Sequence, residues 1–143
     1  SEIGKWQIPG NGYAPFTLRN ELEKFGIKPE EINLRFATHE QKLLYLQSQL
    51  AQGTPIILLV GTEDQQHYIT LLGYNFLDKK NKQFYIYDPL ESATEKNPQI
   101  TIDTNSSFTG NRTLKAKELI DYWEKGGLFG LYEWYGLVIK EAS

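Results

Sequence analysis

The sequence predicts an α+β fold in which an N-terminal helical layer packs on an antiparallel sheet. Two stretches near the N-terminus, residues 15–25 and 38–52, repeat apolar residues at helical spacing. Three later runs, residues 56–60, 67–75 and 83–89, have the length and composition of strands. The charged turn 77–82 joins the last two runs as a hairpin would. Helices followed by hairpin-connected strands are typical of the α+β class.

The two helices have recognisable beginnings and ends. Pro15 suits a first helical turn, where its missing N–H is not needed, and Gly26 ends the pattern carried by Leu18 and Leu22. Residues 27–36 predict a short helical turn that leads into a loop. Thr38 then predicts an N-cap that forms a capping box with Gln41, and Gly53 stops this second helix.

The strands are read from their composition. Residues 56–60, IILLV, form a continuous aliphatic run, as expected of a central strand. His67 opens the second run, and the third stops at Asp88 and Pro89. Residues 91–112 are polar and loop-like, with a short edge strand predicted at 100–103. A helix is predicted from Thr113 or Leu114 to Lys125, followed by a final strand at 137–140.

Length and composition limit the class of protein. The 143 residues predict a single domain, 1–143, with a substantial core. Lys and Arg are scattered along a chain of net charge −3, so the sequence does not indicate a nucleic-acid binder. No apolar run has the length of a membrane span. The chain begins at Ser1 and carries no signal peptide, which leaves the compartment open, a secreted or cell-surface location included.

The chain contains no cysteine. Disulfides and zinc–thiolate sites are therefore excluded, and so is a cysteine nucleophile anywhere in this sequence. This absence matters most for the first helix, because the residue before a helix lies beside unpaired backbone N–H groups, at the positive end of the helix dipole. That position favours an anionic nucleophile or a developing oxyanion.

Three blocks in order carry a family resemblance. Gln7, five intervening residues, Tyr13, Ala14 and Pro15 precede the first helix; HYITLLGY follows at 67–74, and YIYDP at 85–89. The chain resembles the papain-like cysteine peptidases, and within them the branch of bacteriocin-processing (double-glycine leader) peptidases and their stand-alone relatives. In that branch a glutamine lies five residues before a cysteine, which is followed by a small residue, a proline and a helix. Tyr13 stands where this cysteine is expected.

The resemblance implies a papain-like fold and a role for each matching residue. His67 takes the position of the base, Asp88 that of the carboxylate that orients it, and Gln7 that of the oxyanion donor. A histidine that starts one strand and an aspartate that ends its neighbour can meet at one sheet edge, facing the start of the first helix. Taken singly, Asp88 reads as an ordinary turn residue and His67 as a surface histidine.

Tyr13 is a poor substitute for a cysteine. Its phenol has an unperturbed pKa near 10, and the ring moves the attacking atom several ångströms outward. A displacement of about 1 Å can already cost about a hundredfold in rate. The resemblance thus implies a catalytically inactive homologue in which Tyr13 fills the cleft and hydrogen-bonds His67, and whose partner is a peptide or protein segment. The alternative is an active cysteine peptidase or transferase whose nucleophile, at the position of Ala14 or Tyr13, has been replaced.

Other candidate groups are weaker. Asp64 and His67 lack further ligands at metal spacing, so neither a metal nor a cofactor is expected. His39 reads as a solvated histidine in the first turn of the second helix. The aromatic residues could line a peptide groove or a carbohydrate site, although core packing explains at least half of them; they are Trp6, Phe129, Tyr132, Trp134 and Tyr135.

Overall fold

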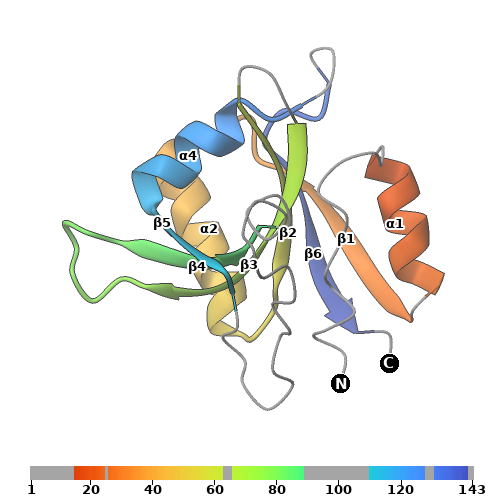
Figure 1. Cartoon of the computed structure of the whole chain (residues 1–143), viewed down its shortest axis with the longest axis horizontal. Helices are drawn as coiled ribbons and strands as arrows, with labels where there is room; N and C mark the ends of the chain where they lie inside the picture. Colours follow the sequence, from red (N-terminus) through yellow and green to blue (C-terminus); the bar gives the residue numbers. More distant parts are fainter. Residues whose placement is uncertain (1–14, 25, 63–65, 89–109, 128–130, 142–143) are drawn as a thin grey trace, which may run out of the picture.

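The computed structural model describes residues 15–24, 26–62, 66–88, 110–127 and 131–141. In these ranges a six-stranded sheet is covered by helices on both faces, with α1 on one side and α2 and α4 on the other (Figure 1). The strand order is β1-β6-β2-β3-β4-β5, and every neighbouring pair is antiparallel. The predicted α+β class and antiparallel sheet are therefore confirmed.

The N-terminal helices form where the sequence predicts them. Helix α1 spans Pro15–Lys24, and Gly26 follows it with a φ of 77°. Helix α2 spans His39–Ala51 and begins with the expected capping box, in which the Gln41 N–H donates to the Thr38 hydroxyl at 3.0 Å. The Thr38 N–H donates in return to the Gln41 side chain at 2.8 Å. The capping box thus gives the backbone N–H groups of Thr38 and Gln41 hydrogen-bond acceptors at the start of the helix.

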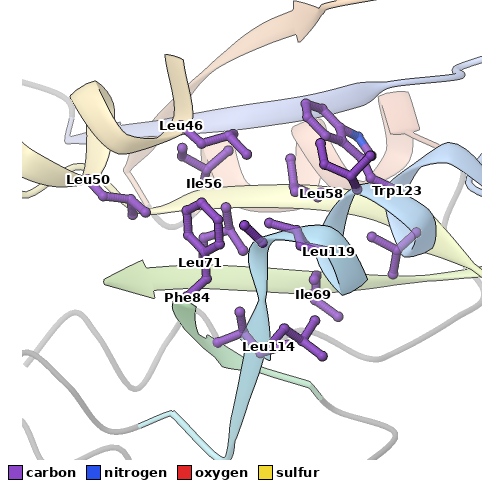
Figure 2. Packing of buried hydrophobic residues seen from close by; sticks show 14 of the residues in the cluster. Leu46, Leu50, Ile56, Leu58, Ile69, Leu71, Phe84, Leu114, Leu119 and Trp123 are labelled. Atoms are coloured by element: carbon purple, nitrogen blue, oxygen red, sulfur yellow. The ribbon is translucent and has the colours of Figure 1, made fainter. Parts of the chain in front are cut away.

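The two helices do not form one layer. Strand β2, Ile56–Gly61, is buried along its whole length and alternates between two cores. Ile56, Leu58 and Val60 pack towards α2 and α4, in the cluster drawn in Figure 2. Ile57 and Leu59 pack on the opposite face, against Leu18 and Leu22 of α1. Because β2 is apolar on both sides, each face of the sheet needs its own helical cover.

The first correction concerns residues 27–36, where a short helical turn was predicted. The structure has strand β1, Ile27–Asn33, paired along seven residues with β6, Tyr135–Glu141. Ion pairs across this pairing include Lys140 Nζ to Glu30 Oε2 at 2.6 Å. The helical turn was predicted from neighbouring residues alone. That prediction was wrong because the partner strand, which lies more than 100 residues away, makes this segment a strand. Pro29 is tolerated because β1 is an edge strand.

The second correction concerns the helix predicted from Thr113 or Leu114. Residues Arg112–Lys115 form strand β5, and helix α4 begins only after it, spanning Ala116–Glu124. Strand β5 pairs with β4, Gln83–Tyr87, from Ile86 opposite Arg112 to Gln83 opposite Lys115. The predicted inward residues Leu119, Ile120 and Trp123 are buried as expected. The edge strand predicted at 100–103 lies outside the described residues.

Strand β3, Gln66–Asn75, is the element that carries His67. It pairs with β2 on one side and with β4 on the other. The register with β2 sets His67 opposite Val60, and the strand alternation directs His67 to the same face as Ile69 and Leu71. His67 therefore faces the α4 side of the sheet.

Two buried tyrosines make the fold sensitive to alkaline pH. Tyr68 is 2% exposed and Tyr135 is 4% exposed, and the Tyr135 hydroxyl donates to Glu31 at 3.2 Å. Burial raises the pKa of both phenols, and the Glu31 carboxylate raises the pKa of Tyr135 further. An unfolded chain loses these protons near pH 10. Above that pH the unfolded state binds fewer protons than the folded state, so the free energy of unfolding falls as pH rises.

We predict that Tyr135→Phe flattens this alkaline loss of stability. Each such tyrosine contributes a slope of about 1.4 kcal/mol per pH unit above pH 10, which the variant lacks. At pH 7 the free energy of unfolding of the variant should be about 1 kcal/mol lower, because the hydrogen bond to Glu31 is lost. Urea denaturation of parent and variant between pH 7 and 11.5 measures both effects. Parallel curves above pH 10 would contradict the prediction.

Candidate functional site

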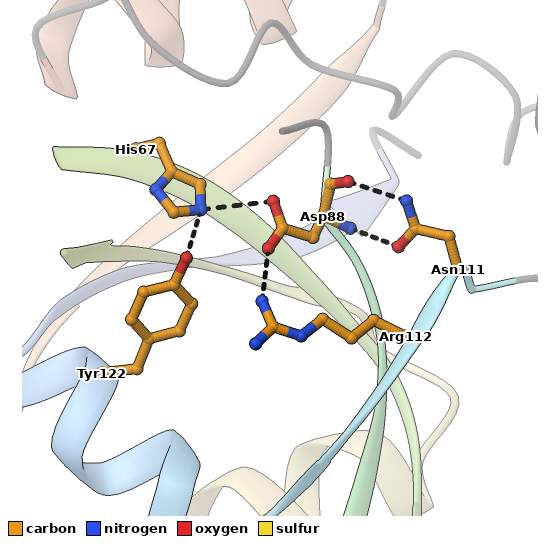
Figure 3. A network of polar contacts seen from close by, with 5 residues as sticks. All are labelled: His67, Asp88, Asn111, Arg112 and Tyr122. Carbon is orange, nitrogen blue, oxygen red and sulfur yellow. Dashed lines mark hydrogen bonds and ion pairs between the residues drawn. The ribbon is translucent and has the colours of Figure 1, made fainter. Parts of the chain in front are cut away.

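His67 and Asp88 meet at the end of neighbouring strands. His67 is the second residue of β3, and Asp88 directly follows β4. Both side chains are 2% exposed, and Nε2 of His67 lies 3.2 Å from Oδ1 of Asp88. The structure therefore brings together two of the residues predicted from the sequence, as Figure 3 shows.

Asn111 fixes the backbone at Asp88. The Asp88 N–H donates to Oδ1 of Asn111 at 2.7 Å, and Nδ2 of Asn111 donates to the Asp88 carbonyl at 2.7 Å (Figure 3). A side-chain amide thus satisfies the backbone N–H and the backbone C=O of one residue at the point where β4 ends. This clamp holds the carboxylate in position towards His67.

Arg112 supplies the positive charge that the buried carboxylate needs. Its Nη1 lies 2.9 Å from Oδ2 of Asp88, and the arginine side chain is 35% exposed. An ionised carboxylate removed from water is costly unless it is paired and hydrogen-bonded. Asp88 has one oxygen on the imidazole and the other on the guanidinium, which meets this requirement.

Tyr122 of α4 adds a second contact to the imidazole. Its hydroxyl oxygen lies 2.7 Å from Nε2 of His67, and the two rings meet edge to face with centroids 5.3 Å apart. The Arg112 guanidinium carbon lies 5.7 Å from the centre of the same phenol ring. Four side chains from β3, the end of β4, β5 and α4 therefore form one polar cluster (Figure 3).

We assign the tautomer of His67 from its contacts. A carboxylate can only accept, so we place the ring hydrogen on Nε2, which lies 3.2 Å from Asp88 and 2.7 Å from the Tyr122 oxygen. In the neutral ring the lone pair is then on Nδ1. Nδ1 is buried and has no hydrogen-bond partner among the described residues. It is the atom of this ring that is free to accept a proton or hydrogen bond from another group.

This geometry excludes one simple reading of Tyr122. In a nucleophile–histidine–carboxylate triad, the nucleophile and the carboxylate use different ring nitrogens. Here Tyr122 and Asp88 contact the same nitrogen, Nε2. Tyr122 is thus not arranged as a nucleophile that His67 activates while Asp88 orients it.

The remaining predicted groups are placed as follows. Gln7, Tyr13, Ala14 and Asp64 lie outside the described residues, as do Trp6 and Phe129. Trp134 and Tyr135 are 9% and 4% exposed, so both belong to the core, whereas Tyr132 is 36% exposed. His39 is exposed at the start of α2, with its ring 5.7 Å from that of Trp134. Within the described ranges, no three His, Asp or Glu residues are grouped so that they could hold a metal ion.

A concavity of about 630 Å³ adjoins the cluster and shares Arg112 and Tyr122 with it. Both signs of charge are present on its walls, which comprise Gly61, Thr62, Arg112, Leu114, Glu118, Asp121, Tyr122 and Lys125. Such a lining suits a ligand with donors, acceptors and charges of both kinds.

Sequence reasoning did not identify Asn111, Arg112 or Tyr122. Asn111 and Arg112 lie more than 20 residues from Asp88, and Tyr122 lies 55 residues from His67. One signal was present: a buried carboxylate at a strand end requires a cation. Nothing in the sequence pattern says which cation, because the β4–β5 pairing that brings Arg112 to Asp88 is not local.

An antiparallel sheet between helices, with a buried histidine–carboxylate pair at the strand ends, defines the class as a papain-like peptidase fold. The model of the Peptidase_C39 like family matches residues 2–125. The chain belongs to this family, which confirms the resemblance carried by the three sequence blocks. No curated protein and no solved structure matches the chain. Among the described helices, none is long and apolar enough to cross a bilayer.

We predict that Arg112→Gln destabilises the protein by about 1–3 kcal/mol, because it removes the cation beside the buried Asp88 carboxylate. The matched control is Arg35→Gln, since Arg35 is exposed and contacts the exposed Phe36 ring. This control should change stability by less than about 0.5 kcal/mol. Chemical denaturation at pH 7 measures both. Equal effects of the two substitutions would show that Asp88 does not depend on Arg112.

Proposed function

We propose that this protein is a catalytically inactive papain-like peptidase homologue that binds a peptide or protein segment in its degenerate cleft. The whole chain acts in this proposal as one domain. The observation that carries it is the buried His67–Asp88–Arg112 cluster in a chain that has no cysteine. In this proposal the cluster corresponds to the groups that would activate a thiol, and the chain has no thiol for them to activate.

The open nitrogen of His67 supports a specific role for Tyr13. Nδ1 carries a lone pair and lacks a partner among the described residues. A buried acceptor left without a donor costs about 1–3 kcal/mol. In our proposal the phenol of Tyr13 donates to Nδ1, which satisfies this atom and closes the position of the nucleophile. Gln7 keeps its amide available for a carbonyl of the bound segment.

The concavity next to the cluster supports a peptide as the ligand. Arg112 and Lys125 offer positive charges, Glu118 and Asp121 negative ones, and Thr62 a hydroxyl. A peptide bound there would extend from the closed nucleophile position across α4. Its volume of about 630 Å³ accommodates a few residues of a segment and falls within the range of ligand pockets.

Restoring a cysteine tests this proposal. Tyr13→Cys should place a thiol beside Nδ1 of His67, where an imidazole lowers the pKa of the thiol. We expect a peptide linked to an electrophile to label Tyr13→Cys at pH 6 at least about tenfold faster than it labels Ala14→Cys. Free iodoacetamide serves as the comparison, and the peptide carries the same iodoacetamide group. Because the two electrophiles are equal, only binding of the peptide portion can make the peptide probe label faster.

The outcomes separate the two functional readings. Faster labelling at position 13, with a further advantage of the peptide probe, supports a retained peptide cleft with a lost nucleophile. Fast labelling and peptide hydrolysis by Ala14→Cys alone would show instead that a working peptidase lost its nucleophile at position 14. Adding His67→Gln to Tyr13→Cys should abolish the advantage at pH 6, and circular dichroism confirms that this variant is folded. Equal, slow labelling at both positions would contradict an arranged site.

A further inference from the structure

Five lysines gather around a second concavity, which lies between α2, α4 and the turn after β3. Its volume is about 460 Å³. Three of the lysines come from the turn and two from the junction of β5 and α4: Lys79, Lys80, Lys82, Lys115 and Lys117. The pairing of Gln83 with Lys115, and the hydrogen bond from the Ala116 N–H to the Lys82 carbonyl at 2.8 Å, hold the two segments together.

These lysines differ in their contacts from three basic residues elsewhere on the surface. Arg19, Lys24 and Lys140 each form an ion pair with a glutamate. Within the described ranges, none of the five lysines forms an ion pair with a carboxylate.

Two carboxylates that border these lysines accept hydrogen bonds from backbone N–H groups. The Asp78 carboxylate accepts from the Lys80 backbone N–H at 2.9 Å, and Glu118 accepts from the Lys115 N–H at 3.0 Å. Lys82 places its ammonium 5.1 Å from the centre of the Phe76 ring. The region thus concentrates positive charge on a chain whose net charge is −3.

The floor of the concavity is apolar and rigid. Ala116 and Ile120 of α4 line it, and both belong to the main core at 8% and 6% exposure. Leu43 and His39 of α2 complete the wall. Because Ala116 and Ile120 are held in the packed core, the floor is preformed, and the five lysines line the space above it.

We infer that this concavity binds a small anion that carries several phosphate groups. A single phosphate group carries a charge of about −1.5 to −2 and three acceptor oxygens, so its charge is concentrated in a small volume. An extended acidic peptide brings at most one carboxylate per residue, and those on one face are about 7 Å apart. Five lysines that line a space of about 460 Å³ therefore match the charge density of a polyphosphate better than that of a peptide.

The shape also disfavours a nucleic acid. A strand of DNA or RNA is held by an extended track of cations interleaved with aromatic side chains on which bases stack. Here the lysines enclose one compact space, and His39 is the one aromatic ring among its lining residues. The site lies at the Lys115 end of β5, whereas Arg112 of the His67 cluster lies at the other end. The inference is therefore independent of the proposed peptide cleft.

The probe for this inference is inorganic tripolyphosphate, titrated calorimetrically into the full chain at pH 7 and about 0.15 M salt, where long-range charge effects are screened. We expect saturable binding of one equivalent. Lys80→Gln/Lys117→Gln should weaken it about tenfold, since two exposed charge contacts together contribute about 1.4 kcal/mol. The matched control Lys24→Gln/Lys28→Gln removes the same charge from the β1 side and should change the affinity less than twofold.

Three results would overturn the inference. They are no saturable binding of tripolyphosphate, equal weakening by both double variants, and tighter binding of a hexaglutamate peptide or a single-stranded oligonucleotide than of tripolyphosphate. Amide chemical shifts give an independent readout. Residues 79–82 and 115–120 should move on titration in the parent chain, and shifts confined to other residues would place the anion elsewhere.

Discussion

The fold depends on one strand that is apolar on both faces. Every residue from Ile56 to Val60 is at most 2% exposed. Strand β2 therefore needs β3 and β6 to satisfy its backbone along both edges, and helices to cover both of its faces. This requirement divides the helices between two sides of the sheet and places the C-terminal strand β6 between β1 and β2. The same register sets His67 opposite Val60, on the face that α4 covers.

The buried charge of Asp88 is the second constraint, and it explains how the polar cluster is built. A carboxylate at 1% exposure persists only with compensation, which comes from Arg112, from His67 and from the backbone clamp of Asn111. A chain selected only for stability could replace this cluster with apolar side chains at little cost. Its presence in a chain without a cysteine is the basis of the binding function that we propose.

The short strand β5 separates two surfaces of different chemistry. The concavity at Arg112 adjoins the His67 cluster and is lined by side chains of both charges. The concavity at Lys115 has five lysines and no carboxylate among its described lining residues. Along the sequence these lysines are scattered and gave no sign of a basic site. The hairpin turn and the start of α4 bring them together, so the proposed anion site and the proposed peptide cleft lie at opposite ends of β5.

The sequence by itself determined the elements whose signals are local. Three features follow from neighbouring residues: the capping box of Thr38 and Gln41, the aliphatic run of β2, and the hairpin around residues 77–82. The order of the family blocks was enough to predict that His67 lies beside Asp88. Only the tertiary structure decided that residues 27–33 and 112–115 are strands, and that Arg112 and Tyr122 reach the histidine. Strand pairing and charge compensation draw on partners that are distant in the chain, and no local pattern encodes which partner that will be.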